Sequence, residues 1–128
     1  METNLLNGLS LAYIGDAVYE LIIRKYVINL GTTSVNNLHK KVIKFTSGIS
    51  QSKAIHYFLN NNLLNEDEIN IFKRGRNCHI HTKRKNMDLQ DYLDATGFEA
   101  LIGYLYLNNQ IDRLNELVDI IIKNGEVL

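Results

Sequence analysis

Apolar residues recur at helical spacing along nearly the whole chain, and no segment competes as a strand. From about Leu9 to Tyr26 the apolar positions are three and four residues apart, which predicts a long amphipathic helix. The chain contains no proline, and glycine and asparagine residues separate the apolar stripes. We therefore expect an all-α fold.

The same spacing predicts five further helices. Their apolar stripes are Val35–Phe45, Ala54–Leu59, Ile69–Phe72, Phe98–Leu105 and Ile111–Ile122. Ser34 is expected to cap the first of them, and Asn65 and Glu68 have the spacing of a capping box. Gly75 is expected to end the helix that this box begins, and the residues from Arg76 to Met87 form a predicted loop.

Length and composition are those of one globular domain over residues 1–128. Apolar residues make up 45% of the chain, and no apolar run reaches the roughly 20 residues that span a bilayer. The one cysteine, Cys78, cannot form an internal disulfide. We expect a cytoplasmic protein that has no contact with a membrane and no N-terminal leader.

The net charge is zero, but one segment is strongly basic. Positions 73 to 85 contain no acid and six cations, which are Lys73, Arg74, Arg76, Lys83, Arg84 and Lys85. The rest of the chain therefore carries a net charge of −6. Such a run is either a solvated surface loop or a contact to phosphates.

Two apolar helices each carry a carboxylate next to or near a glycine. Asp16 follows Gly15 in Leu11–Glu20, and Glu99 lies two residues after Gly97 in Thr96–Leu107. Acids are rarely buried unless they are paired or bind a metal. Glycine lowers helix propensity by about 1 kcal/mol, a cost that close approach of another helix would explain. These acids either converge where the two helices meet, as a seat for a hard cation, or are two boundary residues at the edges of amphipathic helices.

The residues around these acids resemble the ribonuclease III family. Ile14–Val18 is similar to the signature helix of that family, which carries a catalytic Asp, and Phe98–Gly103 is similar to its second acidic helix. Together with Arg74–Asn77, these blocks resemble the compact branch called Mini-ribonuclease III. The full-length pattern has two more acids, at the positions that Ala12 and Thr96 occupy here.

The resemblance implies a homodimeric ribonuclease III endonuclease fold that cleaves double-stranded RNA to 5′-phosphate and 3′-hydroxyl ends. By this resemblance, Asp16 and Glu99 are the catalytic residues and hold the metal ion, which is Mg²⁺ or Mn²⁺ in its place. The implied substrate is the precursor of 23S ribosomal RNA. The alternative is a catalytically silent dimer that binds structured RNA.

The expected RNA contacts come from the basic segment, because the chain ends too early for the RNA-binding domain that usually follows. They are Arg74, Arg76, Lys83, Arg84 and Lys85. Lys40, Lys41 and Lys44 are weaker candidates, for which a solvated helix face is the other interpretation. Tyr13 and Tyr19 belong either to a two-fold interface or to the core.

Overall fold

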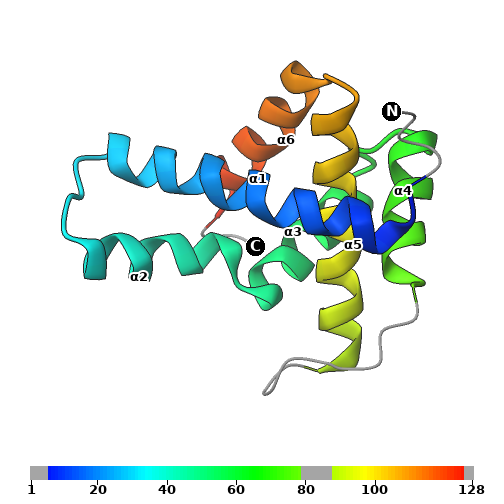
Figure 1. Cartoon of the computed structure of the whole chain (residues 1–128), viewed down its shortest axis with the longest axis horizontal. Coiled ribbons are helices and arrows are strands. Elements are labelled where there is room, and N and C mark those ends of the chain that lie inside the picture. The colour runs from blue at the N-terminus through cyan, green and yellow to red at the C-terminus, as the bar shows by residue number, and fades with distance from the viewer. Residues whose placement is uncertain (1–5, 79–87, 126–128) are drawn as a thin grey trace.

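A computed structural model describes residues 6–78 and 88–125 of the chain, and Figure 1 shows its architecture. The described residues form helices and contain no strand, which confirms the all-α prediction. None of these helices is long and apolar enough to cross a membrane. The helices are α1 (Gly8–Asn29), α2 (Val35–Thr46), α3 (Gly48–Asn60), α4 (Glu66–Arg76), α5 (Leu89–Leu107) and α6 (Ile111–Lys123).

Helix α5 is the centre of the fold. Every residue from Asp94 to Gly103 is buried, because α1 crosses α5 on one side while α3 and α4 pack against it elsewhere (Figure 1). The sequence predicted one apolar face for this helix. A helix that is covered on all sides instead needs small residues wherever a neighbour comes close.

The predicted helix caps are confirmed in part. Asn65 and Glu68 form the full capping box of α4, whereas Ser34 precedes α2 without a side-chain cap. The prediction for Gly75 was wrong, because α4 continues to Arg76. A Cβ atom at Gly75 would lie 2.6 Å from the Cβ of Ala100, so glycine is needed here for contact with α5.

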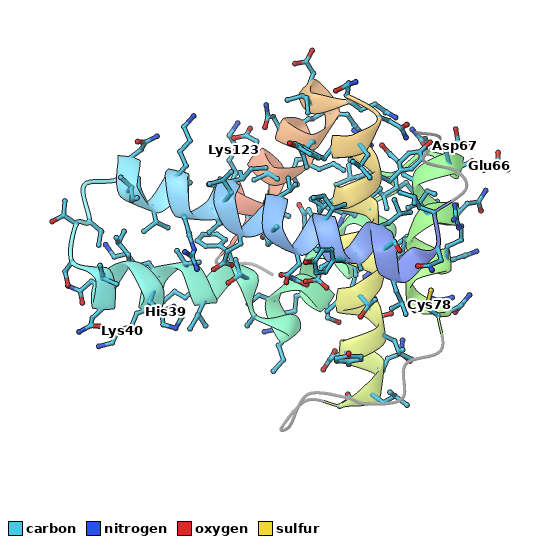
Figure 2. All side chains as sticks on the ribbon, in the orientation of Figure 1. His39, Lys40, Glu66, Asp67, Cys78 and Lys123 are labelled. Atoms are coloured by element: carbon cyan, nitrogen blue, oxygen red, sulfur yellow. The ribbon has the colours of Figure 1, made fainter. Side chains whose placement is uncertain are left out.

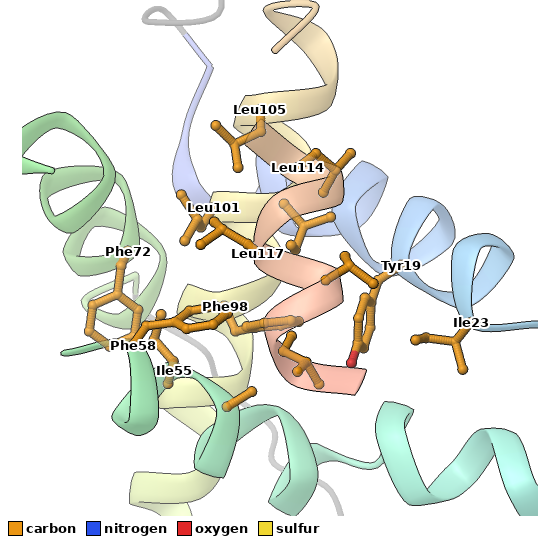
Figure 3. Close-up of a cluster of buried hydrophobic side chains, with 14 of the residues drawn as sticks. Tyr19, Ile23, Ile55, Phe58, Phe72, Phe98, Leu101, Leu105, Leu114 and Leu117 are labelled. Atoms are coloured by element: carbon orange, nitrogen blue, oxygen red, sulfur yellow. The ribbon is translucent and has the colours of Figure 1, made fainter. Parts of the chain in front are cut away.

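The main core lies between α5 and the helices around it (Figure 3). The rings of Tyr19 and Phe98 meet edge to face, with centroids 4.9 Å apart. The Tyr19 hydroxyl donates a hydrogen bond to the carbonyl oxygen of Phe45, and burial raises the pKa of this tyrosine. Tyr19 is therefore a core residue, while Tyr13 is 84% exposed.

Candidate active site

The candidate site lies where α1 crosses α5, and glycine residues allow the two backbones to touch. A Cβ atom at Gly15 would lie 1.8 Å from the carbonyl oxygen of Glu99. One turn along each helix, a Cβ atom at Gly103 would lie 2.0 Å from the carbonyl oxygen of Leu11. The close approach that the glycines indicated is confirmed, and it fixes the two helices at this crossing.

Asp16 and Glu99 are both at this crossing, but their environments differ. Glu99 is 7% exposed and its backbone meets Gly15. Asp16, the next residue after Gly15, is exposed, as expected of a residue at the boundary of an amphipathic helix. At about 100° per residue, the position after Gly15 is turned away from α5 toward solvent. Asp16 lines an open groove together with Tyr13 and Glu20.

The two positions where full-length ribonuclease III has acids offer no carboxylate here. Ala12 is 7% exposed and packs in a small apolar cluster with Leu11 and Ala100. Thr96 is 8% exposed, and its hydroxyl donates a hydrogen bond to the carbonyl oxygen of Tyr92 at 3.0 Å. Asp16 and Glu99 are therefore the acids that this crossing provides from the expected set.

The chemistry of these donors fits a hard divalent cation. Carboxylate oxygens are the ligands that Mg²⁺ takes in proteins, and Mg²⁺ commonly keeps several water molecules and completes its shell with phosphate oxygens. Over residues 6–78 and 88–125, no group of three or more His, Cys, Asp or Glu side chains is arranged to hold a metal ion. A cation at the crossing would thus depend on water and substrate for most of its ligands.

Comparison with known proteins decides the family. The ribonuclease III domain model matches residues 9–110. The Mini-ribonuclease 3 of Clostridium tetani is 52% identical over 91% of this chain and 77% of its own length. That of Streptococcus pneumoniae is 43% identical over 98% of both chains. A crystal structure of a Fusobacterium nucleatum protein superposes with a TM-score of 0.85 at 33% identity, covering 94% of each chain. The chain belongs to the Mini-ribonuclease 3 branch of the ribonuclease III family.

Membership in this family makes the chain an endoribonuclease that acts on double-stranded RNA. Ribonuclease III enzymes are in general dependent on divalent metal ions. The match to the domain model includes all of α5 and all of α1 except its first residue, so it includes the crossing that carries Asp16 and Glu99.

The basic residues predicted to bind RNA are only partly within the described structure. Lys83, Arg84 and Lys85 lie outside the described residues. Arg74 is half-buried at the end of α4 and donates a hydrogen bond to the carbonyl oxygen of Leu6. Arg76 lies over the ring of Phe72, 5.3 Å from its centroid. Arg74 and Arg76 therefore also make contacts within the protein.

Sequence reasoning missed two other buried acids. Asp94 is fully buried, and its Oδ2 lies 2.8 Å from Nε2 of His56, whose side chain is half-exposed. Glu68, 1% exposed, accepts hydrogen bonds from Arg113 at 2.8 Å. Burial alone would raise the pKa of Glu68, but the Arg113 guanidinium and the backbone N–H of Asn65 bring the net pKa below its usual value. The capping-box spacing of Glu68 indicated one of its partners, and nothing in the sequence pattern indicated the other.

Proposed function

We propose that this endoribonuclease uses Mg²⁺ held by Asp16 and Glu99 to hydrolyse double-stranded RNA into 5′-phosphate and 3′-hydroxyl ends. The observation that supports this proposal is the α1–α5 crossing. There the backbone contact between Gly15 and Glu99 fixes the position of one acid relative to the other, and Asp16 remains open to solvent and thus to RNA.

Hydrolysis that leaves 5′-phosphate and 3′-hydroxyl ends adds the oxygen of water to phosphorus and breaks the bond between phosphorus and the 3′ oxygen. Bound Mg²⁺ supplies a water of lowered pKa and neutralises charge on the phosphate. Asp16 presents its carboxylate on the exposed side of α1, where a phosphate can approach. Glu99 is anchored within the all-round packing of α5, so its carboxylate position is preorganised by the fold.

We also propose that the enzyme acts as a homodimer, since a duplex has two strands and one domain offers one such crossing. An apolar groove on the outer side of α1 supports this proposal. Leu21 is 69% exposed there, and Tyr106 and Ile111 extend the apolar surface onto α5 and α6. Contiguous exposed apolar surface is typical of a protein interface. A second copy of the same chain would cover it, and Tyr13 lies on the exposed side of the same helix.

Two basic regions provide the proposed RNA contacts. The first is the segment with Arg74, Arg76, Lys83, Arg84 and Lys85. The second, which we call the α2 lysine face, consists of Lys40, Lys41 and Lys44 and lines a hollow beside the turn before α2. No acidic residue occurs in the sequence from position 31 to 65, so the segment that carries these lysines has no negative side chain of its own. Figure 2 places Lys40 on α2, well away from Cys78 at the end of α4.

We propose the precursor of 23S ribosomal RNA as the cellular substrate, on the strength of the family resemblance. A-form RNA hides its base edges, so the cationic surfaces above would bind its shape and phosphates, and the target would be defined by its duplex structure. Mapping of cleaved ends in total RNA from cells with and without the enzyme tests this choice. Unprocessed 23S ends that appear only without the enzyme support it, and unchanged 23S ends contradict it.

The test of the metal-dependent reaction is cleavage of a perfect RNA duplex with Mg²⁺, with Mn²⁺ and with EDTA. Wild-type protein should cut both strands with either metal and stop in EDTA. Asp16→Asn should cleave at least about a hundredfold more slowly, because a neutral amide binds the metal poorly. Its melting temperature should stay at the wild-type value, since Asp16 is exposed.

The matched control is Asp67→Asn, which neutralises an exposed acid in the first turn of α4 (Figure 2). It should cleave at the wild-type rate. RNA binding without metal-dependent cleavage by the wild-type protein would contradict the proposed reaction and favour a silent RNA-binding dimer.

A further inference from the structure

Helix α1 carries a charged ridge that includes Asp16. Glu20 and Arg24 follow it at intervals of four residues, so all three lie along one side of the helix. From the rise of the helix, Arg24 is about 12 Å along the axis from Asp16. Both Glu20 and Arg24 line the same open groove as Asp16. A nucleic-acid strand that reaches Asp16 along this groove must pass these side chains.

The contact between Glu20 and Arg24 fixes the arginine and leaves part of it free. Nε of Arg24 donates a hydrogen bond to Oε1 of Glu20 at 3.1 Å, and Nη2 lies 3.0 Å from the same oxygen. The Arg24 side chain is still 62% exposed. Guanidinium groups present several donors in a planar fork, so the remaining N–H groups of Arg24 can bind a phosphate while Glu20 holds the other edge.

Arg24 also connects the groove at Asp16 with helix α2. It lines a second hollow, between the end of α1 and α2, together with His39 and Leu38. His39 is followed directly by Lys40 and Lys41 of the α2 lysine face. Figure 1 shows α2 alongside the C-terminal half of α1. Arg24 is thus a cation between the proposed cleavage site and the proposed lysine contacts.

The charges along the ridge make Arg24 the side chain there that attracts RNA phosphates. Asp16 and Glu20 both repel RNA phosphates, and a bound metal ion would offset charge only near Asp16. Arg24 offsets the charge of Glu20 and is the cation at the far end of the ridge. An exposed ion pair within one helix otherwise contributes little to stability.

We propose that Arg24 is a phosphate-binding residue for the RNA strand that enters the cleavage site, and that Glu20 is the residue that positions it. This inference rests on the proposed function of the same site. Glu20 holds the guanidinium along the ridge, and Arg24 contacts the RNA backbone about two helical turns from Asp16.

The test is RNA binding at several salt concentrations, with a perfect duplex in EDTA so that cleavage does not interfere. Arg24→Ala should raise Kd about tenfold, and the slope of log K against log salt should fall by about one, as for loss of one phosphate contact. Arg24→Lys should retain the salt slope and bind with intermediate affinity. Glu20→Gln should change Kd less than Arg24→Ala, because loss of the positioning contact is offset by loss of a charge that repels phosphate, and the cation remains.

The matched control is Lys25→Ala, which removes one exposed cation from the adjacent position, about 100° around the helix. It should leave both Kd and the salt slope unchanged. Equal effects of Arg24→Ala and Lys25→Ala would overturn the inference. A change in the oligomeric state of Arg24→Ala, measured by sedimentation, would also overturn it, because Arg24 would then serve an interface. Failure of the proposed function is a separate result: wild-type protein would not cleave the duplex with Mg²⁺.

Discussion

Two helix contacts in this enzyme each contain a buried acid, and the two acids differ in what they meet: Glu68 meets a guanidinium, whereas Glu99 meets a glycine backbone. At the contact between α4 and α6, Glu68 is 1% exposed and is matched by the guanidinium of Arg113, which also donates to the carbonyl oxygen of Leu63. At the crossing of α1 and α5, Glu99 is buried but Asp16 beside it faces solvent. A buried carboxylate alone therefore does not indicate a reactive site. The exposed neighbour, fixed by backbone contact, is the more informative feature.

The largest effect is expected from a side chain placed into the crossing. In Gly15→Ala the new Cβ would meet the carbonyl oxygen of Glu99 at 1.8 Å, which neither backbone can relieve by a side-chain movement. We expect a loss of more than about 4 kcal/mol of unfolding free energy, or no folded protein, measured by urea denaturation. Gly125→Ala is the control, because its nearest atom would lie at 3.5 Å, and it should leave stability unchanged. Wild-type stability of Gly15→Ala would show that the helices are not held by this contact.

The second largest effect is expected from breaking the buried ion pair of Glu68 and Arg113. Arg113→Ala leaves Glu68 buried without its guanidinium and should lower the unfolding free energy by about 2–3 kcal/mol. This lies below the range for a fully buried pair, because Arg113 is partly exposed. Duplex cleavage at saturating Mg²⁺ should be unchanged under conditions where the variant is folded. Lys123→Ala removes an exposed partner of Asp119 and serves as the control, with no measurable change. Equal stability of the two variants would contradict the structural role of Glu68.

A smaller effect is expected from pH. The pKa of Glu68 is lowered in the folded protein from its ordinary value of 4.5, so the folded state binds the proton less tightly than the unfolded chain. The stabilisation is then fully present above about pH 4.5 and is lost as the pH falls through the folded pKa. Urea midpoints between pH 3 and 7 should fall more steeply on the acid side for wild type than for Glu68→Gln. Parallel curves would show that Glu68 is not held as a carboxylate.

The sequence predicted most of the helices because apolar spacing and caps are local properties. The capping box of Asn65 and Glu68 is one example. The sequence also indicated the crossing, because close contact with another helix explains the helix-propensity cost of Gly15. It could not predict that α5 is buried all round, or that Gly75 is a packing residue, because both depend on which helices lie next to α5. The partners of Glu68 and Asp94 are 45 and 38 residues away in the chain, beyond the reach of any local pattern.

The central claim is that Asp16 and Glu99 act as one unit that holds the metal at the crossing. The most direct measurement is single-turnover cleavage of a perfect duplex over a range of Mg²⁺ concentrations, by wild type, Asp16→Asn, Glu99→Gln and the double variant. Circular dichroism establishes that each variant is folded. We predict that each single variant is slower by at least about a hundredfold and that the double variant is no slower than the slower single one, since residues that act together are not additive. Additive losses, or a wild-type rate for either single variant, would contradict a shared metal site.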